Sequence, residues 1–247
     1  MEDTKEIYVV GNGKSLKGFD FNFLKDKQWI GCCLAFRDWE RTGIYPTHYV
    51  NVDNVVIKSN LEAIKDMIIN KKCETFLFDM CIIDLWKDVI NYTNVNYIQQ
   101  FKMSPYNPFR NLIDYCSGSV ATTLGYCLNT NMIHLLGMDC NYEEFIPECI
   151  ELKDGSLKII KTPKENPNYY FDDYQRVGDI YNKPNTERVH KQSWYDVRNI
   201  FLLFNTLRNK EVKLYTYTDS DALDEYFERR SVSELIKSVQ LNTPEIS

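Results

Sequence analysis

The sequence predicts an α/β fold in which a central, mostly parallel β-sheet is flanked by helices. Short β-prone segments alternate with segments of helical periodicity along most of the 247 residues. Several predicted strands end in glycine or polar residues, which is typical of strands at the ligand-binding edge of a parallel sheet. The alternation stops after Cys140 and resumes after Val189. We therefore expect one domain over residues 1–247, with an irregular lid or acceptor-binding insertion at about 140–190.

Composition excludes several classes of protein. The chain is 44% hydrophobic, which suits a sizeable core, and it has no run of apolar residues long enough to span a membrane. A net charge of −6, without a basic block or zinc-finger spacing, argues against a nucleic-acid partner. Eight cysteines form no Cys-x-x-Cys pair, and the N-terminus shows no signal peptide. These features predict reduced core thiols in a cytoplasmic protein.

The first predicted strand, at 7–10, runs into a Gly-Asn-Gly-Lys-Ser turn at 11–15. Glycine permits positive φ and close approach of a ligand, and amides at a following helix N-terminus would attract an anion. The turn fails the Walker A motif, because Tyr8 replaces a glycine, and it fails the dinucleotide fingerprint at Leu16. A plain strand-to-helix turn is the alternative. The candidates for nucleotide binding are Gly11, Asn12, Gly13 and Ser15, with Lys14 as a point charge or an exposed residue.

The next elements continue the alternation. We expect a helix at 59–70 capped by Ser59 or Asn60, a short helix or loop at 19–24, and strands at 28–34, 46–53, 74–78 and 96–98. Residues 79–95 fit a helix or a loop equally well. The strand at 46–53 ends in Asn51 and Asp53, which makes both residues candidates for ligand binding. Their alternative role is a solvated Asx turn.

A predicted helix followed by a predicted strand occupies residues 116–139. The small, hydroxylated segment at 117–119 should cap a buried helix over 117–128, and a strand over 131–139 then delivers Asp139 at its carboxyl end. Ser117 and Gly118 are candidates for anion binding at the helix N-terminus, with ordinary serine capping as the alternative. Asp139 could bind a ribose hydroxyl, orient an acceptor or hold a metal, or it could cap the strand end.

The last third of the chain begins irregularly. An Asp-Gly-Ser turn at 154–156 predicts a hairpin between 149–152 and 157–160, and the tract at 166–174 is rich in aromatic and polar residues. Regular structure then returns as a helix at 192–208, a strand at 211–216, a short helix from Asp219 or Ser220 to Phe227, and a final helix capped by Ser231. His48 and His134 fall within strand patterns, so we expect them in the core or at a sheet edge.

Several of these fragments resemble the bacterial sialyltransferases of glycosyltransferase family 42 and the related MptE-like (DUF115) proteins. The turn at 11–16 resembles the Gly-x-Gly-Pro-Ser-Leu turn of these families, with lysine in place of proline. Ser117-Gly118, followed by a helix, a strand and Gly-Met-Asp at 137–139, is similar to their Ser-Gly…Gly-Ile-Asp segment. Asn51 matches an asparagine that binds nucleotide in the sialyltransferases. Cys32-Cys33 stands where those enzymes carry a further asparagine.

The resemblance implies a Rossmann-like fold of the GT-A type and a glycosyltransferase that uses a nucleotide sugar, a CMP-sugar in the sialyltransferases. It implies no metal and no cofactor, and a glycan or glycolipid acceptor for an enzyme that is cytoplasmic or peripheral at a membrane surface. The histidine that acts as base there matches His190, for which a surface or capping role is the alternative. The tyrosines that steady the leaving phosphate match Tyr142, Tyr169 or Tyr170.

Two other functions stay open. The MptE-like resemblance implies a pterin diphosphokinase that uses ATP and Mg²⁺, which would require a carboxylate pair such as Asp53 and Asp139. The Asn-Val-Asp segment at 51–53 is only a weak match to an Asp-x-Asp metal motif, because asparagine is the poorer ligand, so we do not expect a metal site. The last alternative is a non-catalytic nucleotide-binding module.

Overall fold

The computed structural model describes residues 5–85, 87, 92–104, 106–143, 146–184 and 191–236. Its centre is an eight-stranded sheet in which every strand pair is parallel. The strands lie in the order β11 (Glu228–Arg229), β10 (Lys213–Tyr217), β6 (Met132–Leu136), β1 (Glu6–Val10), β2 (Trp29–Cys32), β3 (His48–Asn51), β4 (Thr75–Phe78) and β5 (Val95–Tyr97). The predicted α/β class, with a parallel sheet flanked by helices, is confirmed.

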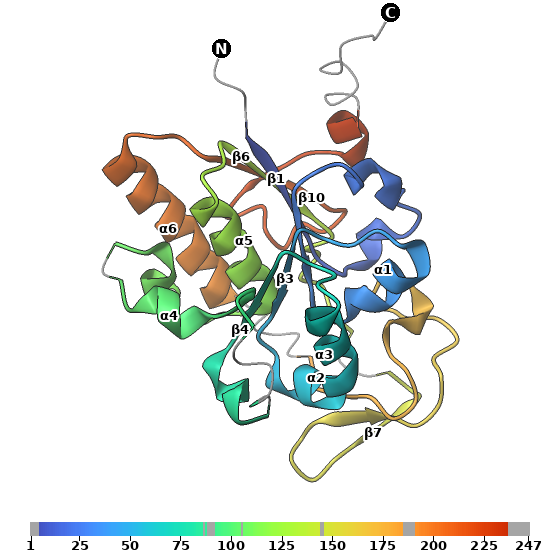
Figure 1. The fold of residues 1–247 in the computed structure, drawn as a ribbon. Helices are drawn as coiled ribbons and strands as arrows, with labels where there is room; N and C mark the ends of the chain where they lie inside the picture. Colours follow the sequence, from blue (N-terminus) through green and yellow to red (C-terminus); the bar gives the residue numbers. More distant parts are fainter. Residues whose placement is uncertain are drawn as a thin grey trace, which may run out of the picture.

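Helices cover both faces of the sheet (Figure 1). One side carries α4 (Ile98–Lys102), α5 (Ser117–Cys127) and α6 (Lys191–Arg208), and the other carries α1 (Phe36–Thr42), α2 (Asn54–Ser59) and α3 (Leu61–Ile69). Strand β1 is buried on both faces, since Ile7 and Val9 pack on the α5 side whereas Tyr8 and Val10 pack on the other. Side chains alternate between faces along a strand, so a continuous apolar run suits a strand covered on both sides.

The strand order creates a switch point beside β1. The chain runs outward from β1 to β5, and then returns to place β6 on the other side of β1, where Tyr8 pairs with Trp29 of β2 and with His134 of β6. The loops after β1 and β6 therefore leave the sheet edge in diverging directions. Ligands of open α/β sheets bind in the crevice that forms at such a point.

The segment after β6 contains a small antiparallel sheet made of β7 (Cys149–Glu151), β8 (Leu157–Ile159) and β9 (Ile180–Tyr181). The predicted hairpin is confirmed, with Cys149 opposite Ile159. Buried side chains of this segment, including Ile146, Leu157 and Tyr170, belong to the same apolar cluster as Tyr8 and Val10 of β1. We call residues 140–184 the insertion.

Short 3-10 helices account for several segments that the sequence left open. They are η1 (Lys14–Leu16), η2 (Phe21–Leu24), η3 (Cys33–Ala35), η4 (Met80–Leu85), η5 (Pro108–Asn111) and η6 (Asp172–Tyr174). The predicted helix at 59–70 is interrupted at Asn60, and helical structure begins earlier because the Asp53 carboxylate caps α2 through the amides of Val55 and Val56. Both His48 and His134 are buried, as expected for strand positions.

The predicted helix ending at Phe227 is wrong. Residues 222–226 form turns, and Glu228 and Arg229 then form β11, paired in parallel with Tyr215 and Thr216 of β10. Residues 218–227 connect the two parallel strands; this connection is shorter than the usual crossover of about a dozen residues or more, and turns rather than a helix span it. Ser231 caps a helical turn as predicted, exchanging hydrogen bonds with Glu234. Among the described residues, no helix is both long and apolar enough to cross a membrane.

Candidate active site

A cavity of about 550 Å³ lies at the switch point. Its walls come from the turn after β1, the ends of β2 and β3, the start of α5, the loop after β6, the insertion and the first turn of α6. Most of the predicted site residues meet here. Those that line the cavity are Gly11, Asn12, Gly13, Asp53, Ser117, Gly118, Asp139, Tyr142 and Tyr169. Ser15, Asn51 and the candidates Lys14 and Tyr170 do not line it, and His190 lies outside the described residues.

The glycines after β1 are required for packing between two loops. A Cβ on Gly11 would lie 2.4 Å from the carbonyl oxygen of Gly137, and a Cβ on Gly13 would lie 2.4 Å from the Asp139 carboxylate. Gly11 and Gly13 do not have positive φ, so it is the close approach that glycine permits, and not a left-handed conformation, that matters here. The two loops at the switch point therefore fit together only because neither glycine carries a side chain.

The expected helix-terminus anion site after this turn is also absent. Only the three-residue η1 follows it, and the Ser15 amide donates to Asp139 Oδ2 at 2.9 Å. The Ser15 hydroxyl donates to the other Asp139 oxygen, which also accepts from Thr218 Oγ1 at 2.6 Å. A carboxylate of the protein thus occupies the place expected for a phosphate. Asp139 also lines the cavity, and its bonds go to the segments after β1 and β10 rather than to the loop that follows it.

Asn51 and Asp53 have different positions at the end of β3. Asn51 is fully buried; its Nδ2 donates to the Tyr49 hydroxyl at 3.1 Å, and its Oδ1 accepts from the Asp53 amide at 3.1 Å. This is the Asx turn that the sequence left as an alternative. Asp53 lines the cavity, caps α2, and accepts from Asn182 Nδ2 of the insertion at 2.9 Å. Asp53 therefore links the sheet edge to the insertion.

Helix α5 begins at the cavity wall. The Ser117 hydroxyl accepts from the Val52 amide at 3.1 Å, which fixes the helix start against the end of β3. A Cβ on Gly118 would lie 3.0 Å from Met138 Sδ, so glycine lets this helix approach the β6 loop closely. An eleven-residue helix that begins here brings the positive end of its dipole to the cavity. This is the feature for which Ser117 and Gly118 were proposed.

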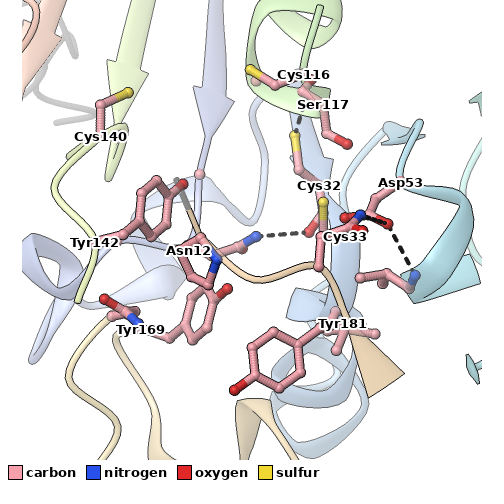
Figure 2. A pocket seen from close by; sticks show the side chains of 18 of the residues that line it. Asn12, Cys32, Cys33, Asp53, Cys116, Ser117, Cys140, Tyr142, Tyr169 and Tyr181 are labelled. Atoms are coloured by element: carbon pink, nitrogen blue, oxygen red, sulfur yellow. Dashed lines mark hydrogen bonds between the residues drawn. The ribbon is translucent and has the colours of Figure 1, made fainter. Parts of the chain in front are cut away.

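Asn12 spans the cavity between β2 and the insertion (Figure 2). Its Nδ2 donates to the Cys32 carbonyl at 3.2 Å and to the Tyr174 hydroxyl at 3.1 Å. Its Oδ1 is buried and has no hydrogen-bond partner among the described residues. A buried acceptor without a partner is costly, and a ligand hydroxyl or amine could satisfy it.

Tyrosines line the side of the cavity formed by the insertion. Tyr142 follows β6, Tyr169 stacks on Tyr174 with ring centroids 3.7 Å apart, and Tyr181 belongs to β9 (Figure 2). Burial raises the pKa of the Tyr142, Tyr169 and Tyr174 hydroxyls well above the usual value for tyrosine. They therefore stay protonated at neutral pH and can donate hydrogen bonds.

The insertion is attached to the first turn through its backbone. Gly13 and Tyr169 form an antiparallel bridge, and the Tyr170 amide donates to the Asn12 carbonyl at 3.1 Å. The Tyr170 side chain points away from the cavity and donates to Asp38 Oδ2 at 3.1 Å. Tyr169 is therefore placed beside the site, and its neighbour anchors the segment.

Sequence patterns missed a group of thiols in the same cavity. Cys32, Cys33, Cys116 and Cys140 all line it, and burial raises the pKa of Cys33 to about 12 (Figure 2). They were expected in the core because most of the cysteines sit inside apolar stretches. Cys33 and Cys140 both have positive φ, which bends the backbone sharply after β2 and after β6. The sequence pattern does not predict these bends. Other lining residues that were not singled out are Tyr174, Tyr181, Asn182 and Lys183.

Metal ligands do not gather in this cavity. Among the residues described, no three His, Cys, Asp or Glu side chains form a group that could hold a metal ion. The two acidic candidates, Asp53 and Asp139, already accept hydrogen bonds from backbone and side-chain donors. Metal independence stays a prediction that a chelator can test.

The parallel sheet, the switch-point cavity and the insertion together define an open α/β fold with a crevice of the kind that binds ligands. The chain is similar to the sialyltransferase CstII from Campylobacter jejuni in complex with the substrate analogue CMP-3FNeuAc, with a TM-score of 0.53 and 15% identity over 91% of this chain and 86% of that chain. It is also similar to the sialyltransferase CST-II in complex with trisaccharide acceptor and CMP (TM-score 0.50, 15% identity, 91% and 86% covered). The MAf glycosyltransferase from Magnetospirillum magneticum AMB-1 gives a TM-score of 0.51 at 14% identity, over 94% of this chain and 34% of that chain.

These similarities establish the fold. No protein-family model matches the chain, and no curated protein matches its sequence. The expected likeness to the sialyltransferases is thus supported as a likeness of fold, whereas the likeness to the MptE-like group stays a prediction.

Proposed function

We propose that this protein is a glycosyltransferase that moves a sugar from a nucleotide sugar, a CMP-sugar in the first instance, to a glycan acceptor. The observation that carries the proposal is the cavity at the switch point, where nine of the candidate residues named from the sequence and the resemblance meet. Support also comes from the fold, which a sialyltransferase in complex with CMP and a trisaccharide acceptor shares. A cavity with convergent polar groups is the usual form of a small-molecule site.

The nucleotide would bind between the turn after β1 and the start of α5. The Asn12 Oδ1 atom offers a hydrogen-bond acceptor to a nucleoside hydroxyl or amine, and the dipole of α5 favours the phosphate beside Ser117 and Gly118. In this arrangement the sugar would face the insertion, where Tyr142 and Tyr169 line the cavity.

Transfer breaks the bond between the sugar anomeric carbon and the phosphate oxygen, and forms a bond from that carbon to the acceptor oxygen. The acceptor hydroxyl gives its proton to a base, for which His190 is the candidate, and the nucleotide leaves with the bonding electron pair. The Tyr142 and Tyr169 hydroxyls would stabilise the negative charge that develops on the phosphate. Their raised pKa makes them hydrogen-bond donors that do not ionise.

A donor screen tests the proposal. Melting temperature and hydrolysis are measured with CMP-, UDP-, GDP- and dTDP-sugars, each with and without EDTA. A cognate donor at a hundred times its Kd should stabilise the fold by about 2.7 kcal/mol, which raises the melting temperature by roughly 5–10 °C for a chain of this size. A shift with ATP and Mg²⁺ alone would identify a diphosphokinase. The absence of any shift would leave a non-catalytic module.

Variants test the catalytic roles. We expect His190→Ala to abolish transfer without changing the melting temperature, and Tyr142→Phe and Tyr169→Phe to lower kcat by about 10²-fold each. Tyr226→Phe is the matched control, because Tyr226 lies outside the cavity. Full activity of His190→Ala would remove His190 from the mechanism.

The diphosphokinase alternative fits the geometry less well. It needs a carboxylate pair free to hold Mg²⁺, and Asp139 accepts three hydrogen bonds from Ser15 and Thr218. Asp53 caps α2 through two amides and accepts from Asn182. Metal binding would have to replace these bonds.

A further inference from the structure

Two segments of the chain combine exposed apolar side chains with positive charge. We define the apolar–basic patch as the exposed residues of two segments, 98–113 and 191–210. Seven of the twelve exposed large hydrophobic residues of the described chain belong to it, so the apolar exposure is concentrated there. They are Met103, Tyr106, Ile113, Tyr195, Leu202, Leu203 and Leu207.

Helix α6 contributes exposed apolar side chains. Trp194, Val197 and Phe204 are buried on the side that packs against α5. Tyr195 and Leu202, seven residues apart and therefore on one face, are 47% and 58% exposed. Lys191 and Arg198 are exposed on the same helix, so its outer face mixes apolar and basic side chains. Leu207, at the C-terminal end of the helix, is 67% exposed.

The charge of the patch is opposite to that of the whole protein. The two segments contain six cations and one acid, Asp196, in a chain with a net charge of −6. Four of these cations are exposed and belong to the patch, namely Arg110, Lys191, Arg198 and Arg208, whereas Lys102 and Lys210 are half-buried. Asp196 is buried and accepts hydrogen bonds from Ile113 N, Asp114 N and Gln192 Nε2. It therefore presents no negative charge at the surface. Asp114 and Glu211 are the acids that bound the segments.

The two segments form one continuous surface. The amide of Ile113 donates to Asp196 of α6 at 3.0 Å, and η5 packs against both α4 and α6. In Figure 1, α6 lies outside α5 on the same side of the molecule as α4. Met103 and Tyr106, each 84% exposed, lie between α4 and η5 in the chain and so belong to this side of the sheet.

We propose that the apolar–basic patch docks on the surface of an anionic lipid bilayer. Leucine, methionine and tyrosine side chains among lysines and arginines match the interface, where apolar groups enter the acyl boundary and cations meet the headgroups. A second copy of the chain fits less well, because a two-fold contact would place the four exposed cations of one patch against those of the other. A nucleic acid would neutralise the cations but would leave the leucines of α6 in water.

Docking in this orientation also indicates the class of acceptor, an inference that rests on the proposed function. Trp194, in the first turn of α6, lines the cavity. The bilayer would lie along the outer side of the same helix, so the acceptor class that fits best is a glycan attached to a lipid. Binding to the bilayer itself does not depend on sugar transfer.

Flotation with vesicles tests the docking in the absence of any nucleotide sugar. The full chain should bind vesicles of 70% phosphatidylcholine and 30% phosphatidylglycerol, bind weakly to pure phosphatidylcholine, and dissociate as salt is raised, because salt screens the charges. Arg110→Gln with Arg198→Gln should weaken binding about 25-fold, at about fivefold per cation. Leu202→Ser with Leu207→Ser should also weaken it, and both positions are exposed enough for the fold to survive.

Matched controls lie on the other side of the sheet. Ile69→Ser removes an apolar side chain that is 50% exposed, and Lys25→Gln with Lys58→Gln removes two exposed cations; neither variant should change vesicle binding by more than about twofold. The proposal is overturned if wild type fails to bind anionic vesicles at low salt, or if the controls weaken binding as much as the patch variants. Dimerisation lost in the leucine variant, or preferential binding of duplex DNA over vesicles, would assign the patch to those partners instead. Each of these outcomes is independent of the donor screen.

Discussion

Asp139 is the residue that joins the separate loops of the candidate site. Its carboxylate accepts from Ser15 N at 2.9 Å, from the Ser15 hydroxyl and from Thr218 Oγ1 at 2.6 Å, so it connects the segments after β1, β6 and β10. Gly13 provides the space, since a Cβ there would meet the same carboxylate at 2.4 Å. Hydrogen bonds to a buried charged acceptor contribute more than those to a neutral one.

Substitution of Asp139 by asparagine should therefore be costly. The amide has one acceptor oxygen, and its NH₂ group would face a donor that loses its partner. We expect Asp139→Asn to lower the free energy of unfolding by about 2–3 kcal/mol, measured as a lower urea midpoint at unchanged slope. Asp173→Asn, in an exposed pair with Arg176, should cost at most about 1 kcal/mol. An unchanged midpoint for Asp139→Asn would show that these bonds contribute little.

At the scale of elements, the insertion is held to the sheet domain by a buried ion pair. Arg37 of α1 donates to Asp179 through Nη1 at 2.6 Å and Nη2 at 2.9 Å, and also to the Tyr174 carbonyl and to Asn60 Oδ1 at 2.6 Å each. The Ile180 amide donates to Ser59 Oγ of α2 at 2.9 Å. These contacts fix η6 and β9, which carry Tyr174 and Tyr181 into the cavity.

Removal of Arg37 should loosen the insertion. Arg37→Ala leaves the Asp179 carboxylate buried without its cation, which costs about 3–5 kcal/mol for a pair of this kind. We expect faster proteolytic cleavage between residues 146 and 184, together with weaker donor binding. Arg176→Ala is the control, because the Arg176–Asp173 pair is exposed. Equal cleavage rates for the two variants would mean that the ion pair does not hold the insertion against the sheet domain.

At the scale of the whole molecule, the eight cysteines lie at positions that range from buried to exposed. All are free thiols; Cys32, Cys73, Cys140 and Cys149 are buried, and Cys81 is exposed. Burial raises the pKa of Cys33 to about 12 and is the largest cause of the rise at Cys81 to about 11. Thiol reagents react with the thiolate, so both positions should react slowly at neutral pH.

Alkylation of the native protein at pH 8 should modify Cys81 first and Cys33 more slowly, and unfolding should expose all eight thiols. A bound nucleotide should slow modification of Cys33, which lines the cavity, without protecting Cys81, which does not. Peptide mass spectrometry over time measures both effects. Modification of Cys73 or Cys149 as fast as Cys81 would contradict the burial of these side chains.

Local sequence patterns were sufficient for most elements and for the position of the site. The apolar run at Ile7–Val10, the alternating strand and helix around Ser117 and the periodicity of α6 each depend on neighbouring residues, so their patterns predicted β1, α5 and α6. Polar residues after buried strands predicted the sheet edge at which the cavity lies. Because the carboxyl ends of parallel strands share one edge, residues predicted at strand ends, such as Asp53 and Asp139, meet there without any knowledge of strand order, whereas Tyr142 and Tyr169 were named from the family resemblance.

Tertiary structure alone decided how those residues are used. Asp139 bonds to Ser15 and Thr218, which are 124 and 79 residues away in sequence, and Asn51 turns inward to Tyr49 while Asp53 faces the cavity. Cys33 faces the site because of a sharp bend after β2, and residues 222–226 turn so that β11 can pair with β10. For Asp139, long-range hydrogen bonds decide the outcome. A sequence pattern records only local preferences of about 1 kcal/mol or less per residue, so it does not contain these bonds.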